Sequence, residues 1–279
     1  MSTETTTAAP TTGPIPDLRM KRPGGLAALF YDGAITSWRN LVVLPRTPEL
    51  LFFTLVQPVM FVVLFNYVFG GAIEGSLPPG VPYAQFLIPG ILVQTIVFGS
   101  AATSVGLAED LSKGIVDRFR SLPITRSAVL VGRIVADTVR LTLVALVMLV
   151  VGVLVGFRFE GGLLAGVMMV VTAVSFGWAM SWILANIGLR VKDPETAQTA
   201  GFVWLFPLSF VSSVFTPVAT MPGWLQPIAR NNPVTLVANL LRGLAVGHVQ
   251  AAMVWPVLAW IVGITVVFAP MAVRRYRTV

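Results

Sequence analysis

Long apolar runs separated by short polar segments dominate the pattern of this chain. A run of about 20 apolar residues is long enough to cross the hydrocarbon of a bilayer as a helix. The pattern predicts six such helices, at residues 49–70, 84–106, 128–156, 163–187, 199–218 and 251–272. The third run is so long that its first two turns are expected to protrude into the cytoplasm. The sequence therefore predicts an all-α, multi-pass membrane protein with six transmembrane helices.

Residues 108–122, between the second and third runs, show a helical period of polar and apolar positions. The apolar positions are Leu107, Leu111, Ile115, Phe119 and Leu122, and the charged ones are Asp110, Lys113, Asp117, Arg118 and Arg120. Acids near the start and bases near the end suit the helix dipole, and Pro123 ends the segment. Spacing alone leaves two interpretations open: a cytoplasmic helix gripped by a partner, or a solvated connecting helix that lies on the bilayer.

Residues 24–44 are predicted to form a second amphipathic helix. Leu26, Phe30 and Trp38 share one face, whereas Asp32 and Arg39 lie on the other. Such a helix just before the first run is expected to lie in the cytoplasmic interface, where it is either part of the mechanism or a peripheral anchor. Residues 1–23 begin with a Thr-, Ala- and Pro-rich stretch, so they are predicted to be a disordered cytoplasmic tail.

The segment 218–246, between the fifth and sixth runs, is apolar but repeatedly interrupted by proline. It cannot be one spanning helix, because proline breaks a helix interior. Two short helices that dip partway into the outer leaflet fit the pattern better, and Trp224 suits the headgroup level. Irregular backbone at that depth must be covered by protein or line a cavity. We therefore expect this segment to line or cap the outer end of a pathway, with a candidate residue set of Pro217, Pro222, Trp224, Pro227, Asn232 and Pro233.

Composition and charge agree with a membrane location. Apolar residues make up 56% of the chain and charged residues 11%, against about a quarter in soluble domains. Basic residues predict the orientation, because cytoplasmic loops are enriched in them. With six spans, the side that holds both termini carries Arg19, Lys21, Arg22, Arg39, Arg46, Lys113, Arg118, Arg120, Arg126, Arg133, Arg190, Lys192, Arg274, Arg275 and Arg277, and the other side only Arg158, Arg230 and Arg242. Both termini are therefore predicted to be cytoplasmic, and the net charge of +7 complements lipid headgroups rather than nucleic acid.

Few residues in the chain are candidates for catalysis, metal binding or substrate contact. It contains no cysteine and a single histidine, His248, so we expect neither a metal site nor a catalytic site. The polar residues Gln57, Asn66 and Gln94 in the first two runs are candidates for a pathway or a seam between subunits, although contacts between helices explain such residues better than contact with a substrate does. Arg133, Asp137 and Arg140 are spaced to form an ion-pair ladder on the third run. None of the other runs has a lone acid at its centre, which argues against a proton- or sodium-coupled carrier.

Four motifs resemble the membrane subunits of ABC type-2 transporters, in particular the daunorubicin-resistance permeases of actinobacteria. The motifs are Arg46-Thr-Pro-Glu-Leu50 leading to Gln57-Pro58, Phe69-Gly-Gly71, Lys113-Gly-Ile-Val-Asp-Arg-Phe-Arg-Ser-Leu-Pro123, and Thr216-Pro217 through Met221-Pro-Gly-Trp-Leu-Gln226 to Asn232-Pro233. The resemblance covers about residues 25–277, and the last two motifs are its most specific part. One departure is Ser112, where relatives often carry an acid.

The resemblance implies a cell-membrane permease, residues 24–277, that dimerises and exports cargo with a cytoplasmic ABC ATPase. The implied coupling helix is 108–122, with the site residues Asp110, Lys113, Gly114, Asp117, Arg118, Arg120, Leu122 and Pro123. ATP and magnesium would bind the partner, because this chain has no G-x-x-x-x-G-K-[ST] loop. Amphipathic drugs or lipids are the implied cargo. A secondary multidrug carrier or channel without an ATPase, a structural subunit, and pairing with a sister permease instead of a second copy remain open.

Overall fold

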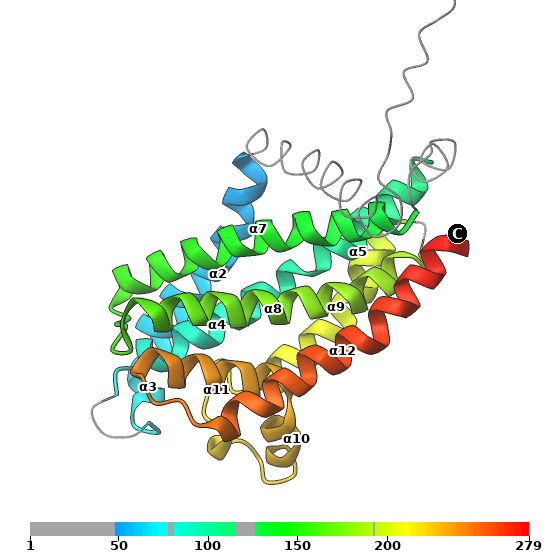
Figure 1. Ribbon diagram of the computed structural model, residues 1–279. Coiled ribbons are helices and arrows are strands. Elements are labelled where there is room, and N and C mark those ends of the chain that lie inside the picture. The colour runs from blue at the N-terminus through cyan, green and yellow to red at the C-terminus, as the bar shows by residue number, and fades with distance from the viewer. Residues whose placement is uncertain (1–47, 78–80, 115–125, 192, 279) are drawn as a thin grey trace, which may run out of the picture.

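The computed structural model describes residues 48–77, 81–114, 126–191 and 193–278, and in these ranges every regular element is a helix (Figure 1). The all-α class is therefore confirmed. The predicted tail, 1–23, and the predicted interface helix, 24–44, lie outside the described residues. In chain order the elements are α2 (Pro48–Val63), η2 (Leu64–Phe69), α3 (Gly70–Glu74), α4 (Tyr83–Gly99), α5 (Ala101–Ser112), α7 (Arg126–Val155), α8 (Gly162–Gly188), α9 (Pro194–Phe210), η3 (Val218–Thr220), α10 (Gln226–Asn231), α11 (Pro233–Val246) and α12 (Ala251–Thr278).

Five helical stretches of the described chain are long and apolar enough to cross a membrane. They are Val56–Glu74, Tyr83–Ser112, Val129–Val155, Gly162–Gly188 and Ala251–Tyr276, which confirms a multi-pass membrane protein. The predicted run 199–218 differs from the structure, because α9 ends at Phe210 and residues 211–216 form no helix. The first predicted run, 49–70, is a helix whose last part, η2, is wound as a π-helix.

Helix α4 and its continuation α5 lie at the centre of the bundle. Helices α7 and α8 run side by side, and α12 runs along α8 and ends at the right of Figure 1, where α9 begins. At the opposite end, the α7–α8 turn lies beside the end of α11, where the backbone N–H groups of Glu160 and Gly161 donate to the carbonyl of Ala245. The two ends of the bundle therefore carry different segments of the chain.

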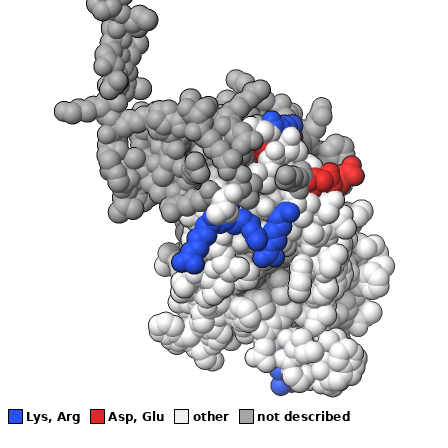
Figure 2. All heavy atoms as spheres, turned by 90° about the vertical axis from the view of Figure 1, so that its right-hand side faces the viewer, with Lys and Arg blue, Asp and Glu red and all other residues white. Residues whose placement is uncertain are grey.

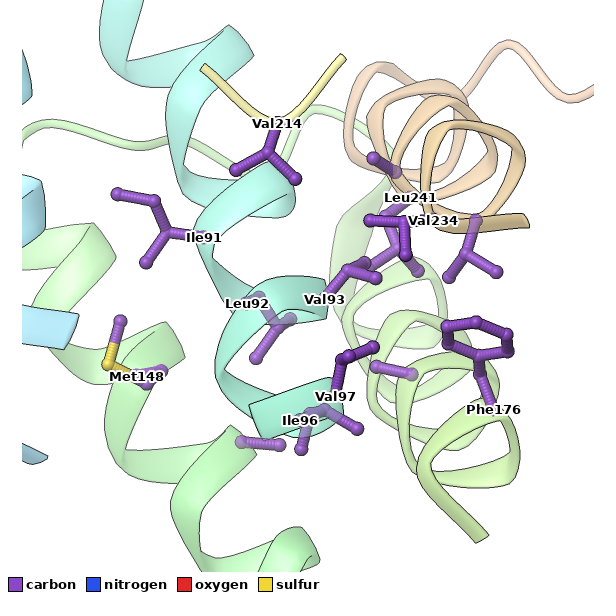
Figure 3. Packing of buried hydrophobic residues seen from close by; sticks show 14 of the residues in the cluster. Ile91, Leu92, Val93, Ile96, Val97, Met148, Phe176, Val214, Val234 and Leu241 are labelled. Atoms are coloured by element: carbon purple, nitrogen blue, oxygen red, sulfur yellow. The ribbon is translucent and has the colours of Figure 1, made fainter. Parts of the chain in front are cut away.

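The core is built around the side chains of α4. Ile91, Leu92 and Ile96 are fully buried and meet residues of α7, α8 and α11 such as Met148 and Phe176 (Figure 3). Between helices in a membrane there is little hydrophobic gain, because lipid is as apolar as leucine, so close packing supplies the stability. Glycines on the neighbouring helices allow this close packing, because they have no side chain.

Helix α5 uses small residues for the same purpose. Its buried residues include Thr103, Ser104 and Gly106, and a side chain at Gly188 of α8 would lie 2.3 Å from the backbone oxygen of Ser104. Helices approach this closely only where small residues face each other. The helix ends at Ser112 and the chain turns at Gly114, whose φ of +64° suits glycine and few other residues.

Candidate functional site

A cavity of about 610 Å³ lies between α2, α4, α5, α7 and α9, toward the end of the bundle where α5 ends. Its lining alternates aromatic rings with side-chain amides: Phe61, Phe98 and Phe202, and Gln57, Gln94 and Gln198. Aromatic faces bind apolar and cationic groups, whereas amides donate and accept hydrogen bonds. The cavity can therefore accommodate a molecule with both apolar and polar parts.

Charged side chains of α5 and α7 also line this cavity. Arg140 lies 3.8 Å from the carboxylate of Asp137, and both side chains are largely buried. The carboxylate also accepts a 2.7 Å hydrogen bond from the hydroxyl of Thr103, while Arg140 donates to the carbonyl of Gly99 at 2.8 Å. These contacts link α7 to the junction of α4 and α5.

The predicted ion-pair ladder on α7 is correct for one step and wrong for the other. Arg133 forms its ion pair with Asp110 of α5, rather than with Asp137. Gly106 makes room for this, because a Cβ atom there would lie 1.5 Å from the Arg133 guanidinium. The spacing of four between Arg133 and Asp137 did not determine the partner of Arg133, since the carboxylate of Asp110 on the neighbouring helix is closer.

The predicted coupling helix, 108–122, does not begin as a separate element. Residues 108–112 are the last turn of α5, and the chain turns at Gly114. Of the predicted coupling residues, Asp110 pairs with Arg133, and Lys113 is exposed and pairs with Glu109. Asp117, Arg118, Arg120, Leu122 and Pro123 lie outside the described residues.

The surface around this end of the molecule is charged. Figure 2 shows the end that carries the C-terminus, where basic and acidic side chains occupy separate areas. Exposed charged residues of the nearby helix ends include Arg190, Asp193, Glu195 and Arg274. Asp193 caps α9: hydrogen bonds from the Thr196 hydroxyl, and then from the Thr196 backbone N–H, hold the pKa of its carboxyl below the usual value.

The segment 218–246 contains short helices, as the prolines predict. Pro217 precedes η3, Pro227 lies in the first turn of α10, and Pro233 occupies the first position of α11. Trp224 is 73% exposed and Pro222 is also exposed. The structure therefore brings Pro222 and Trp224 to the surface, whereas Pro233 is buried.

Asn232 has two roles in this segment. Its side-chain oxygen accepts from the backbone N–H of Val234 at 2.8 Å, which caps α11. Its amide nitrogen donates to the carbonyls of Leu208 and Val211, both at 2.7 Å. It thereby holds the last turn of α9, and this explains why the predicted helix 199–218 ends at 210.

Two of the three predicted pathway residues meet in the cavity. Gln57 and Gln94 line the same cavity from α2 and α4. Asn66 lies in η2 and is absent from the lining, beside the exposed residues Tyr67 and Val68. Within the described ranges, no group of three His, Asp or Glu side chains is placed to hold a metal ion.

Sequence reasoning missed Arg242 of α11. It was placed with the outer basic residues, yet its guanidinium is partly buried and reaches three segments of the chain. The available signal was a single arginine in an otherwise apolar helix, which in a membrane protein marks a paired and constrained side chain. Its contacts are described below.

Comparison with known proteins agrees with these features. The ABC-2 type transporter family matches residues 34–246. The daunorubicin resistance ABC transporter permease protein DrrB1 of Streptomyces coeruleorubidus is 35% identical over 86% of this chain and 84% of its own length. The probable doxorubicin resistance ABC transporter permease protein DrrC of Mycobacterium tuberculosis is 30% identical over 80% of each chain, and the probable multidrug ABC transporter permease YbhR of Escherichia coli is 23% identical over 71% of this chain and 54% of its own. The resemblance carried by the four motifs is thereby confirmed, and the chain belongs to the ABC-2 type transporter family, as one of its membrane permeases.

Proposed function

We propose that this chain is the permease subunit of an ATP-driven exporter that moves amphipathic drugs or lipids outward across the cell membrane. The observation that carries the proposal is the cavity of about 610 Å³ lined by aromatic rings and amides. An amphipathic molecule can place its apolar part against the rings and its polar part against the amides. The names of the relatives, which refer to daunorubicin and doxorubicin resistance, support a drug-like cargo.

The proposed topology has six crossings, with both termini in the cytoplasm. The sixth crossing is α9 together with residues 211–216, and α10 and α11 dip into the outer leaflet. Support comes from the backbone of residues 212–215, which is irregular yet buried. Inside a membrane such backbone is tolerated where protein satisfies its polar groups, as Arg242, Thr235 and Tyr83 do here.

A separate cytoplasmic ATPase is proposed to dock on residues 108–122. A second permease, either another copy or a sister chain, is proposed to bind the surface of α2, η2 and α9. Helices α2 and α9 border the cavity, and η2 and α9 expose large apolar residues, among them Tyr67, Val68, Trp204 and Phe210. A partner on that surface would enclose the cavity between the two subunits.

Docking is tested by replacing Arg118 and Arg120 together with Glu. Reversing two charges should abolish co-purification of the ATPase while the permease still inserts, because Arg binds carboxylates on a partner with two parallel hydrogen bonds. The matched control replaces Arg274 and Arg275 with Glu, on the same predicted side but on α12. Normal assembly of the first variant would contradict the docking site.

Transport through the cavity is tested by Ala102→Phe, which places a ring in the cavity lining. Drug-stimulated ATP hydrolysis and efflux of a fluorescent lipophilic drug should fall, with ATPase binding unchanged. Ala259→Phe, on the exposed surface of α12, is the control and should behave like the wild type. Efflux that persists with a catalytically dead ATPase would instead favour a secondary carrier.

A further inference from the structure

Arg242 uses every hydrogen-bond donor that an arginine has. Its Nε donates to the carbonyl of Phe86 at 2.9 Å. Nη1 donates to the Ser213 hydroxyl at 2.9 Å and to the Asn239 side-chain oxygen at 2.8 Å. Nη2 donates to the carbonyls of Ser213 at 2.6 Å and Val214 at 3.4 Å. These five contacts equal the five N–H groups of a guanidinium, and all the acceptors are uncharged.

The charge of Arg242 is balanced without an acid. In the part of the chain that the structure describes, no carboxylate forms an ion pair with it, and its guanidinium carbon lies 3.6 Å from the centre of the Phe86 ring. A cation removed from water is costly unless its donors are satisfied. Moving any one of the contacted segments away would leave donors unpaired, so Arg242 holds these segments together. It has no donor left for a ligand.

Further contacts join the same segments. The hydroxyl of Tyr83 donates to the carbonyl of Phe215 at 2.8 Å. Gly90 packs directly on the backbone of Val214, because a Cβ atom at Gly90 would lie 2.4 Å from the Val214 oxygen. The first two turns of α4 and residues 213–215 therefore form one tightly connected unit, which we call the outer clasp: Tyr83, Phe86, Gly90, Ser213, Val214, Phe215 and Arg242.

A single long helical stretch connects the outer clasp to the opposite end of the molecule. Helices α4 and α5 continue through Ser100, whose backbone N–H donates to the carbonyl of Ile96 at 3.0 Å. The stretch Tyr83–Ser112 has 30 residues, or about 45 Å at 1.5 Å per residue. Its far end carries Glu109 and Asp110, which belong to the segment 108–122 that is proposed to dock the ATPase.

We propose that Arg242 is a positioning residue that couples the ATPase to the outer segment of the permease. When the ATPase moves the inner end of α5, the α4–α5 stretch moves as a rigid body. The outer clasp then transfers this movement to residues 211–216 and to α11. This inference rests on the proposed function, since it requires an ATPase at residues 108–122. Arg242 acts on cargo only through the segments that it holds.

The test compares Arg242→Gln with Arg230→Gln in the full permease–ATPase complex in nanodiscs. Arg230 belongs to the same segment but is exposed, and among the described residues its side chain donates a hydrogen bond to Gln226. Arg242→Gln should bind the ATPase and hydrolyse ATP, whereas drug transported per ATP should fall at least about threefold, as expected for a coupling residue. Arg230→Gln should keep the wild-type ratio, and Arg242→Lys, which keeps the charge but loses the forked geometry, should be intermediate.

A second readout follows the outer segment directly. Because the chain has no cysteine, Thr220→Cys introduces a single thiol at an exposed position of η3. Its labelling rate with an impermeant maleimide should change when the ATPase is trapped with vanadate. With Arg242→Gln added, the rate should no longer respond to trapping.

Three outcomes decide the proposal. A wild-type transport ratio, or a preserved labelling response, in Arg242→Gln would overturn the coupling role. If this variant does not fold, the milder changes Tyr83→Phe and Ser213→Ala each remove one hydroxyl of the outer clasp, and normal ratios in both would equally overturn it. If the wild-type permease binds no ATPase, the proposed function fails instead, a result that the co-purification step identifies separately.

Discussion

The α4–α5 stretch stabilises arginine in different ways along its length. Arg140, at the junction of α4 and α5, pairs with the carboxylate of Asp137, and Arg133, near the end of α5, pairs with that of Asp110. At the outer end, Arg242 is held by carbonyls, a hydroxyl and an amide oxygen. The difference follows from the backbone. In regular helices most backbone carbonyls already accept hydrogen bonds within the helix, so a cation between two helices is balanced by an acid. The irregular segment 211–216 has carbonyls without such bonds, and those of Ser213 and Val214 accept from Arg242.

Removal of the buried acid beside the α4–α5 junction should have the largest effect. Asp137→Asn would leave Arg140 buried without an opposite charge, which is expected to lower the free energy of unfolding by about 3–5 kcal/mol. The more exposed pair is the matched control, and Asp110→Asn should cost about 1 kcal/mol. Unfolding by SDS in mixed micelles measures both. Equal losses in the two variants would show that burial does not distinguish the pairs.

Close backbone contacts exist at both ends and predict the next largest effect. Ala at Gly90 would meet the backbone of Val214, and Ala at Gly188 would meet the backbone of Ser104. Backbone cannot move aside as a side chain does, so each change should cost about 1–3 kcal/mol, near the upper limit.

Gly263→Ala is the control for these two substitutions. It has no atom within 4 Å of the new methyl group and lies inside α12, so it should instead stabilise by about 0.5–1 kcal/mol. Thermal unfolding midpoints of the three variants test the order. A stable Gly90→Ala would show that the outer clasp tolerates a wider separation than the structure has.

The sequence predicted the long regular helices of the fold better than the irregular segment after α9. Residues 128–156 and 163–187 were predicted as helices, and α7 and α8 match them within two residues at each end, because long apolar runs determine such helices locally. The end of α9 was missed, since Asn232 binds the carbonyls of Leu208 and Val211 from more than twenty residues away.

In the candidate site, too, features of the local sequence were predictable and contacts with distant residues were not. Gln57 and Gln94 were recognisable as polar residues in apolar runs, and both line the cavity. The partner of Arg133 was not predictable from spacing, because Asp110 lies on another helix. Arg242 was marked as a single arginine in an otherwise apolar helix, but its partners could not be predicted, since most of its acceptors are backbone carbonyls, which every residue has.

Asn232 offers a smaller effect that is specific to the outer end. Asn232→Ala removes the cap of α11 and both hydrogen bonds to the end of α9, so it should cost about 2 kcal/mol. Asn231→Ala is the control, because Asn231 is exposed and bonds only to the carbonyl of Pro227. The control should stay within about 0.5 kcal/mol of the wild type in the same SDS titration. A small loss in both variants would mean that α9 ends at Phe210 for another reason.

The smallest expected effect is a difference in pH dependence between the N-terminal caps of α9 and α11. Both α9 and α11 begin with an Asx–Pro pair, Asp193-Pro194 and Asn232-Pro233, but only Asp193 can ionise. Hydrogen bonds from Thr196 hold the pKa of Asp193 below its usual value. The stabilisation by this cap is therefore fully present above the pKa of an unfolded Asp, about 3.9, and is lost as the pH falls through the lower folded value.

The stability difference between wild type and Asp193→Asn should accordingly shrink below about pH 4, because the protonated wild type no longer has its charged cap. The loss due to Asn232→Ala should not change over the same range, since that cap carries no proton. Unfolding titrations of the three proteins between neutral and acidic pH measure both trends. A difference for Asp193→Asn that grows as the pH falls would contradict the role of its carboxylate as the cap of α9.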